Sequence, residues 1–114
     1  MKKKKLSFNQ EIVLAQIPYG LENPVRSQEI AKRVGMSKRD VMEVISTLII
    51  DHNIPIGGGR SEGKYGYFII ENEDERIRAI TPLKNTVVNI KQRIERIEKI
   101  DVTTKVIKPN EYGG

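Results

Sequence analysis

The chain has 114 residues, of which 38% are hydrophobic, 31% are charged and 5% are aromatic. This length accommodates one small domain with an appendage, which excludes a multidomain enzyme in this chain. The lack of cysteine excludes disulfides and thiolate metal sites, and it favours a cytoplasmic location. The formal net charge is +5, and the first 50 residues carry most of the excess, which favours an anionic partner.

The first residues do not resemble an export signal. Lys2–Lys5 is followed by Ser7–Glu11, which is not an apolar segment. No run approaches the roughly 18 to 20 apolar residues of a membrane helix. We therefore expect no membrane partner, and no small-molecule ligand or cofactor is evident. The lysines form either a solvated tail or an arm that contacts phosphates.

Three short helices are predicted in the first half of the chain. Ser7 and Gln10 have the spacing of a capping box, and Phe8, Ile12 and Ala15 recur at helical intervals behind it.

Serine caps also predict the second and third helices. Ser27 is expected to cap a helix that Gly35 ends, and Ser37 with Asp40 begins a helix that ends near Asn53. The apolar residues expected to face the core from these two helices are Ile30, Ala31, Val34, Val41, Val44, Ile45 and Leu48.

A β-hairpin is predicted after the third helix. Ile54–Ile56 and Tyr65–Ile70 are rich in residues that favour strands, and the glycine-rich stretch Gly57–Lys64 between them is expected to form the loop. Glycine permits the positive φ angles that a hairpin tip requires.

A terminal helix with a heptad pattern is predicted next. Asn72–Glu75 is expected to cap it, and its acidic residues suit the positive end of the helix dipole. Pro82 either starts a fresh helix capped by Thr81 or lies within a continuous one, and both remain open. Apolar residues then recur at alternating spacings of three and four. They are Ile80, Leu83, Val87, Ile90, Ile94 and Ile97.

The heptad seam has two possible roles. It is either the inner face of a helix folded onto its own domain or a surface for self-association. We favour self-association, because Arg93 and Glu98 flank the seam where they would attract each other across a parallel pair.

Ser27–Leu48 also has the features of a helix-turn-helix. Ala31 is small where two helices must approach closely, Gly35 permits the turn, and Val41 follows six residues later. This spacing resembles that of bacterial and phage DNA-binding proteins.

With the hairpin included, residues 7–70 resemble a winged helix-turn-helix domain of the phage or mobile-element type. Ile54–Ile56 and the later Gly66–Phe68 resemble the residues that bracket the wing tip in small regulators. The expected fold class is mainly α with a small β-hairpin and a C-terminal coiled-coil-like helix. We expect a basic arm at 1–6, the winged domain at 7–70, a helical oligomerisation segment at 71–101 and a tail at 102–114.

The resemblance implies that the third helix reads the major groove and that the hairpin supports it. The expected contacts from the recognition helix are Ser37, Lys38, Arg39, Glu43 and Thr47. Those from the wing are Arg60 and Lys64, and those to the DNA backbone are Arg26, Lys32 and Arg33.

No catalytic or metal site is expected. His52 lacks a nucleophile or a second ligand nearby in the sequence, and Tyr65 stands where a phosphate loop beginning at Gly58 would need serine or threonine. We predict a homo-oligomer, most simply a homodimer, that binds double-stranded DNA sequence-specifically and regulates transcription. An accessory factor for replication or excision of a mobile element remains open, as does a protein adaptor that binds no DNA.

Overall fold

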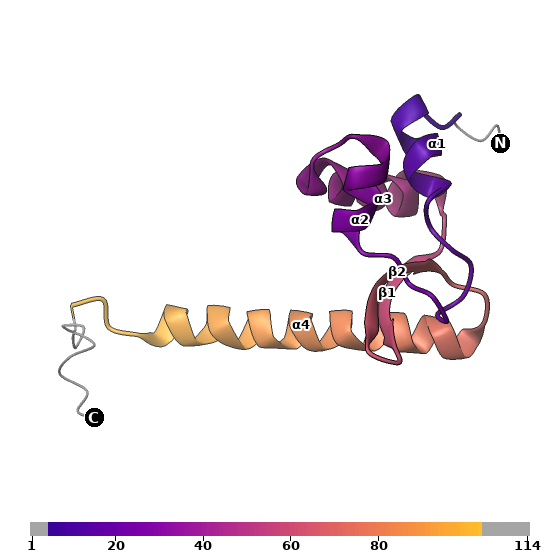
Figure 1. Ribbon diagram of the computed structural model, residues 1–114. Coiled ribbons are helices and arrows are strands. Elements are labelled where there is room, and N and C mark those ends of the chain that lie inside the picture. The colour runs from indigo at the N-terminus through magenta and orange to yellow at the C-terminus, as the bar shows by residue number, and fades with distance from the viewer. Residues whose placement is uncertain (1–4, 104–114) are drawn as a thin grey trace, which may run out of the picture. The chain divides into compact units, whose positions relative to one another are not determined.

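The computed structural model describes residues 5–103 (Figure 1). Its elements are α1 (Phe8–Leu14), α2 (Ser27–Val34), α3 (Lys38–His52), β1 (Ile56–Ser61), β2 (Lys64–Ile69) and α4 (Glu73–Lys99). The chain is therefore mainly helical, with a small antiparallel hairpin and a long C-terminal helix, which confirms the predicted fold class. Most of the predicted basic arm and tail lies outside the described residues. Contacts divide the chain into two compact units, one ending at Leu83 and the other beginning at Lys84.

The caps of α1 and α3 form as the sequence predicts. The backbone N–H of Gln10 donates to the Ser7 hydroxyl at 3.1 Å, and the Gln10 side chain accepts from the Ser7 N–H at 2.8 Å. The Ser37 hydroxyl accepts from the Asp40 N–H at 3.0 Å. These bonds satisfy N–H groups that have no partner within a helix, and so they fix where each helix begins.

The predicted cap of α2 is wrong, and one apolar residue of α1 faces away from the core. Ser27 does not cap α2: Arg26 holds the N-cap position without a side-chain hydrogen bond, and Ser27 is the first helical residue and buried. Phe8 does not face the core of the domain, because its side chain is 74% exposed, while Val13 is the fully buried residue of α1. The short α1 therefore packs through the face that carries Val13.

The main core lies among the three helices and the inner face of the hairpin. Gly35 ends α2 with φ 70°, a left-handed conformation that glycine adopts without steric cost. Asn53 ends α3 in the same region. The buried residues of this core are Val13, Ile17, Val25, Ile30, Ala31, Val41, Ile45, Leu48, Ile56 and Ile69.

The glycine-rich stretch is a strand, so the prediction that it forms the loop is wrong. β1 pairs with β2 from Ile56↔Ile69 to Ser61↔Lys64, and only Glu62 and Gly63 form the turn. Both have positive φ, 45° and 80°, as a two-residue type I′ turn requires. The connection is thus tighter than the sequence suggested, and Ile54 precedes the strand.

The connector between α1 and α2 widens this sheet. Val25 exchanges two backbone hydrogen bonds with Tyr67, at 2.9 and 2.7 Å, and Gly20 donates to the Ile69 carbonyl at 2.8 Å. A side chain at Gly66 would collide with the backbone of Val25, since its Cβ would lie 2.3 Å from the carbonyl carbon. The glycine therefore lets the connector pair with β2.

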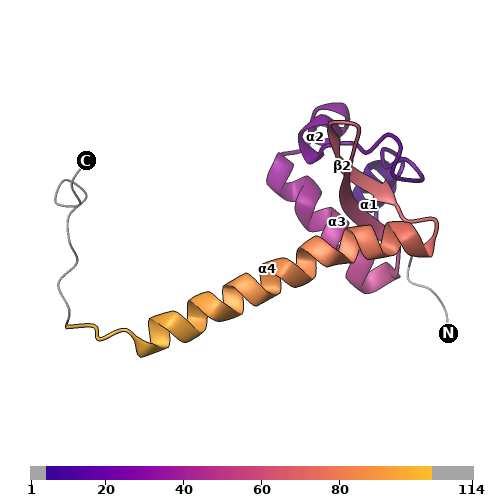
Figure 2. The same cartoon turned by 90° about the horizontal axis from the view of Figure 1, so that it is seen from below.

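The first turns of α4 cover the outer face of the hairpin. Figure 1 shows the hairpin between the α1–α3 cluster and these turns, and Figure 2 shows the same turns from below. Leu21, Phe68 and Ala79 form a second small core there. The glycines of β1 permit this packing, because a Cβ at Gly57 would lie 2.7 Å from Cβ of Ala79.

A carboxylate holds α4 to the connector. Glu75 accepts the Leu21 N–H at 2.9 Å through one oxygen and the Glu71 N–H at 2.8 Å through the other. The predicted cap also forms, with the Glu75 N–H donating to Asn72 at 2.9 Å.

Pro82 lies inside the continuous α4, which settles the question that the sequence left open. Thr81 caps no fresh helix, since its hydroxyl donates to the Ile77 carbonyl one turn earlier at 2.8 Å. Beyond the end of α4, hydrogen bonds from the hydroxyl and the N–H of Thr103 lower the pKa of Asp101 below its ordinary value.

Replacing Gly57 by alanine should destabilise the domain by about 1–3 kcal/mol, because the added methyl overpacks the interface with Ala79. Chemical denaturation followed by circular dichroism measures the change in unfolding free energy. Gly58→Ala is the matched control one residue along the same strand, since a Cβ there meets nothing within 4 Å. Equal stability of the two variants would contradict the proposed packing.

Candidate nucleic-acid interface

α3 has one buried face and one exposed face. Val41, Ile45 and Leu48 point into the core, while Arg39 and Glu43, four residues apart, share a face that is exposed. Lys38 is exposed in the same first turn. The Ser37 cap fixes where this turn begins, so the two cations are held at a defined helix end. A helix of this kind can present arginine and glutamate to base edges in a major groove.

Two predicted contact residues of this helix have structural hydrogen bonds. The Ser37 hydroxyl caps the helix, although it can still donate its proton. The Thr47 hydroxyl donates to the Val44 carbonyl at 2.7 Å and accepts from the Gln10 side chain at 3.0 Å. Thr47 is partly buried and joins α3 to α1 in this way. We therefore leave Thr47 out of the candidate interface.

The residues predicted for the wing, Arg60 and Lys64, lie on strands rather than in a loop. Arg60 is paired with Tyr65 across the hairpin, and Ser61 with Lys64, directly next to the turn. Both cations are exposed. Glu62 is exposed at the turn itself and reduces the positive charge of the tip.

Tyr65 of the hairpin contacts Arg26 at the start of α2, which sequence analysis missed. The guanidinium carbon of Arg26 lies 4.2 Å from the centre of the Tyr65 ring, and that of Arg60 lies 5.8 Å from it. Such cation–π contacts at exposed sites contribute about 0.5–1 kcal/mol each. The ring is 48% exposed. No local sequence signal could reveal this contact, because Arg26 and Tyr65 are far apart in the chain.

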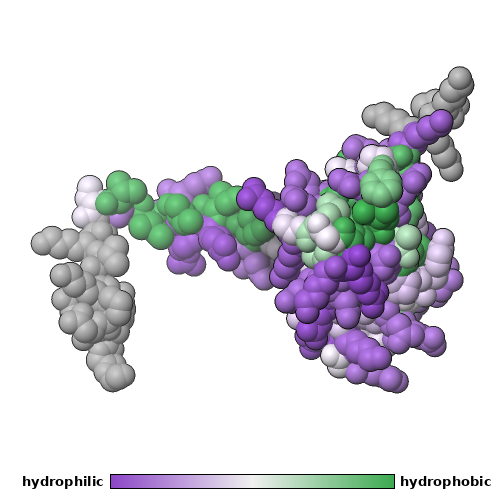
Figure 3. Space-filling model, turned by 45° about the horizontal axis from the view of Figure 1, so that its top comes forward, coloured by the Kyte–Doolittle hydropathy of each residue, from purple (hydrophilic) through white to green (hydrophobic). Residues whose placement is uncertain are grey.

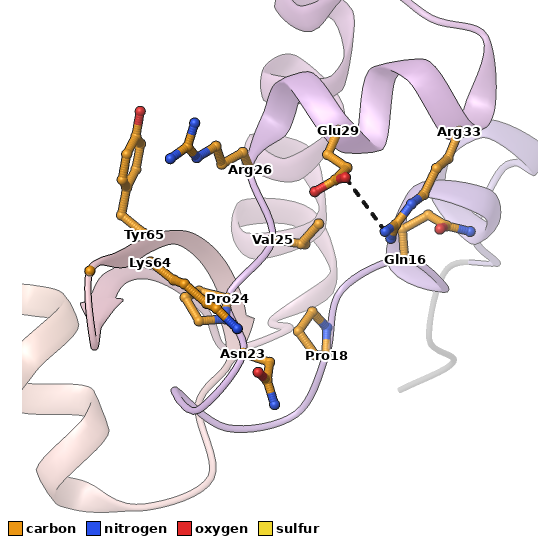
Figure 4. Close-up of a pocket in the computed structure, with 11 residues that line it drawn as sticks. Gln16, Pro18, Asn23, Pro24, Val25, Arg26, Glu29, Arg33, Lys64 and Tyr65 are labelled. Atoms are coloured by element: carbon orange, nitrogen blue, oxygen red, sulfur yellow. Dashed lines mark ion pairs between the residues drawn. The ribbon is translucent and has the colours of Figure 1, made fainter.

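A groove of about 520 Å³ lies between the hairpin tip and α2 (Figure 4). Arg26, Arg33 and Lys64 contribute positive charge to its lining, and Glu29 contributes the one carboxylate. Arg33 lies 3.9 Å from Glu29 in an exposed pair, which adds little to stability. The structure thus brings together three of the predicted DNA contacts. Lys32 is exposed on α2 but does not line the groove.

Other kinds of site find no support in the described part of the chain. Within residues 5–103, no three histidine, cysteine or carboxylate side chains are grouped as a metal site would need. No helix in that range is both long enough and apolar enough to span a bilayer.

Comparison of the chain with protein-family models, with curated proteins and with solved structures finds no match in any of the three. The functional interpretation therefore rests on the residues and their geometry.

Thr47→Val should reduce the free energy of unfolding by about 1 kcal/mol, because it removes the acceptor for Gln10 while preserving the side-chain volume. Urea denaturation of the two proteins measures this loss. Ser46→Ala, an exposed change on the same helix, serves as the control and should leave stability unchanged. If the Thr47→Val protein were as stable as the control, the hydrogen bond between α1 and α3 would contribute nothing to the free energy of unfolding.

Proposed function

We propose that this chain binds double-stranded DNA sequence-specifically as a homo-oligomeric regulator of transcription rather than acting as an enzyme. The observation that carries the proposal is the exposed first turn of α3, where Lys38 and Arg39 follow a fixed cap opposite the buried face. An arginine in this position can bind guanine through two hydrogen bonds. Glu43 on the same face can accept from cytosine.

The cationic groove supports the same function through a different kind of contact. Arg26, Arg33 and Lys64 can neutralise phosphates, which fixes the position of the protein on the duplex without reading its sequence. The contact of Arg26 with Tyr65 restricts the guanidinium before binding. Restriction of this kind lowers the entropy lost when the complex forms.

Duplex binding is tested by fluorescence anisotropy on a labelled random-sequence duplex and a single strand at several salt concentrations. Binding to the duplex that weakens steeply with salt supports the proposal. The slope of the logarithm of the binding constant against the logarithm of salt concentration gives the number of phosphates contacted. No binding at low salt would refute it and would turn attention to a protein partner. Selection from random sequences then gives the preferred site, and its position relative to promoters or to replication and attachment regions tests the regulatory role.

Arg39→Ala should weaken binding to the preferred site by about 1–3 kcal/mol and relax specificity at one guanine position, because a bidentate base contact is lost. Competition with single-base variants of the selected site measures both effects. Lys99→Ala removes a cation from the end of α4 and is the control, with no change in specificity expected. Unaltered specificity in a folded Arg39→Ala protein would remove α3 from the reading of bases.

Arg26→Gln should weaken binding by a similar factor on all sequences and reduce the salt slope by about one, because one phosphate contact is lost. Anisotropy titrations across salt concentrations on selected and random duplexes measure this change. Arg76→Gln neutralises a cation that is paired with Glu73 at 2.7 Å, and it should leave the slope unchanged. A loss confined to the preferred sequence would show that Arg26 reads bases instead.

A further inference from the structure

α4 carries an apolar seam that no other part of residues 5–103 buries. The six residues at the core positions of the heptad are between 36% and 65% exposed. The first core position is held by Ile80, Val87 and Ile94, and the second by Leu83, Ile90 and Ile97. Figure 3 shows hydrophobic atoms along α4 with hydrophilic atoms beside them.

The period of the seam indicates what covers it. An ideal helix repeats every 3.6 residues, so a strict heptad pattern drifts by about 20° per heptad around a straight helix. A second helix that coils around the first stays in contact with the seam as it drifts, whereas a flat surface loses contact with it. A second copy of α4 provides a helix with the same repeat and the same apolar residues.

Pro82 is compatible with this partner. It occupies the third heptad position, which faces away from the seam. The backbone hydrogen bond that proline cannot donate is therefore missing on the outer side of the helix.

Charge decides the orientation of the two helices. In an antiparallel pair that buries all six seam residues, Ile80 lies opposite Ile97 of the second copy. Lys84 then lies beside Lys91 of the second copy, and the two like charges repel on that flank. In a parallel, in-register pair, Arg93 lies beside Glu98 of the second copy, and this attraction occurs twice.

Arg93 and Glu98 are available for this contact. Among residues 5–103 the ion pairs are Arg33–Glu29, Arg76–Glu73 and Arg78–Asp74, so neither Arg93 nor Glu98 has an ionic partner there.

We propose that α4 pairs with α4 of a second copy in a parallel, in-register coiled coil, with Arg93 of each copy beside Glu98 of the other. This inference rests on the proposed function for its biological use. The DNA-binding residues precede α4 in the chain, so parallel pairing joins the two copies at the same end of the coil. Two domains joined there suit an inverted repeat read by a twofold dimer.

Disulfide trapping tests the orientation, since the natural chain has no cysteine. Ile80→Cys and Ile97→Cys proteins are each oxidised at low concentration and examined on non-reducing gels. In the parallel pair each variant should cross-link to itself, because identical core positions face each other. In the antiparallel pair the identical positions lie about 25 Å apart, too far for a disulfide, and only a mixture of the two variants cross-links. Cross-linking of the mixture alone would overturn the proposal.

Lys99→Cys is the matched control for random collisions, because it lies close to Ile97 in the chain but on the outer side of the heptad. It should cross-link much more slowly than Ile97→Cys. Equal rates for the two variants would overturn the proposal.

Charge reversal tests the flanking pair by sedimentation equilibrium of the full chain. Arg93→Glu and Glu98→Arg should each weaken association several-fold, and the double variant should restore it. Lys99→Glu should have no effect. A double variant weaker than either single variant would overturn the pairing, and a monomer or a trimer of the natural chain would overturn the two-chain coil.

These experiments contain no DNA, so their outcome is separate from that of the proposed function. Salt-dependent duplex binding by a chain that fails the trapping test would refute only the coiled coil. A trapped parallel pair without duplex affinity would refute only the DNA-binding proposal.

Discussion

The contact between β1 and the start of α4 is the constraint on which the rest of the domain depends. Without a Cβ at Gly57, the strand approaches Ala79 closely enough for Leu21 and Phe68 to be buried beside it. Ile56, the neighbour of Gly57 in β1, packs into the main core on the opposite face of the hairpin. A two-stranded hairpin is marginal alone, and packing on both faces stabilises this one.

The pairing of the α1–α2 connector with β2 determines where the charged side chains lie. Val25 pairs with Tyr67, so the residue that follows it, Arg26, is carried next to the hairpin. The guanidinium lies over the Tyr65 ring, and the start of α2 and the hairpin tip line the same groove. Cations from distant parts of the sequence thus share one surface because the backbone of the connector is part of the sheet.

Local signals in the sequence predicted the caps of α1, α3 and α4 and the fold class, whereas features that depend on tertiary contacts could not be predicted. Ser37 and Gln10 act within one turn of the chain, so their spacing is sufficient. The prediction of a glycine-rich loop is wrong because the role of Gly57, close approach to Ala79 of α4, depends on a residue far along the chain. The hydrogen bond of Thr47 with Gln10 was also beyond local signals, because the two residues lie 37 positions apart in the chain. No local signal in the sequence predicts the contact of Tyr65 with Arg26 either.

Within α4, the packing of the domain and the heptad seam follow each other without a loop. Ala79 is buried against the hairpin, and Ile80 begins the seam at the next residue. Under the proposed function α3 of one copy makes few base contacts, so a single domain is expected to bind DNA weakly. Joining two domains makes the second binding event intramolecular, which raises the overall affinity for DNA. This gain in affinity requires that both half-sites can be bound at once. The proposed parallel coil would meet this condition, because α4 begins directly after the domain that the coil would join to a second copy.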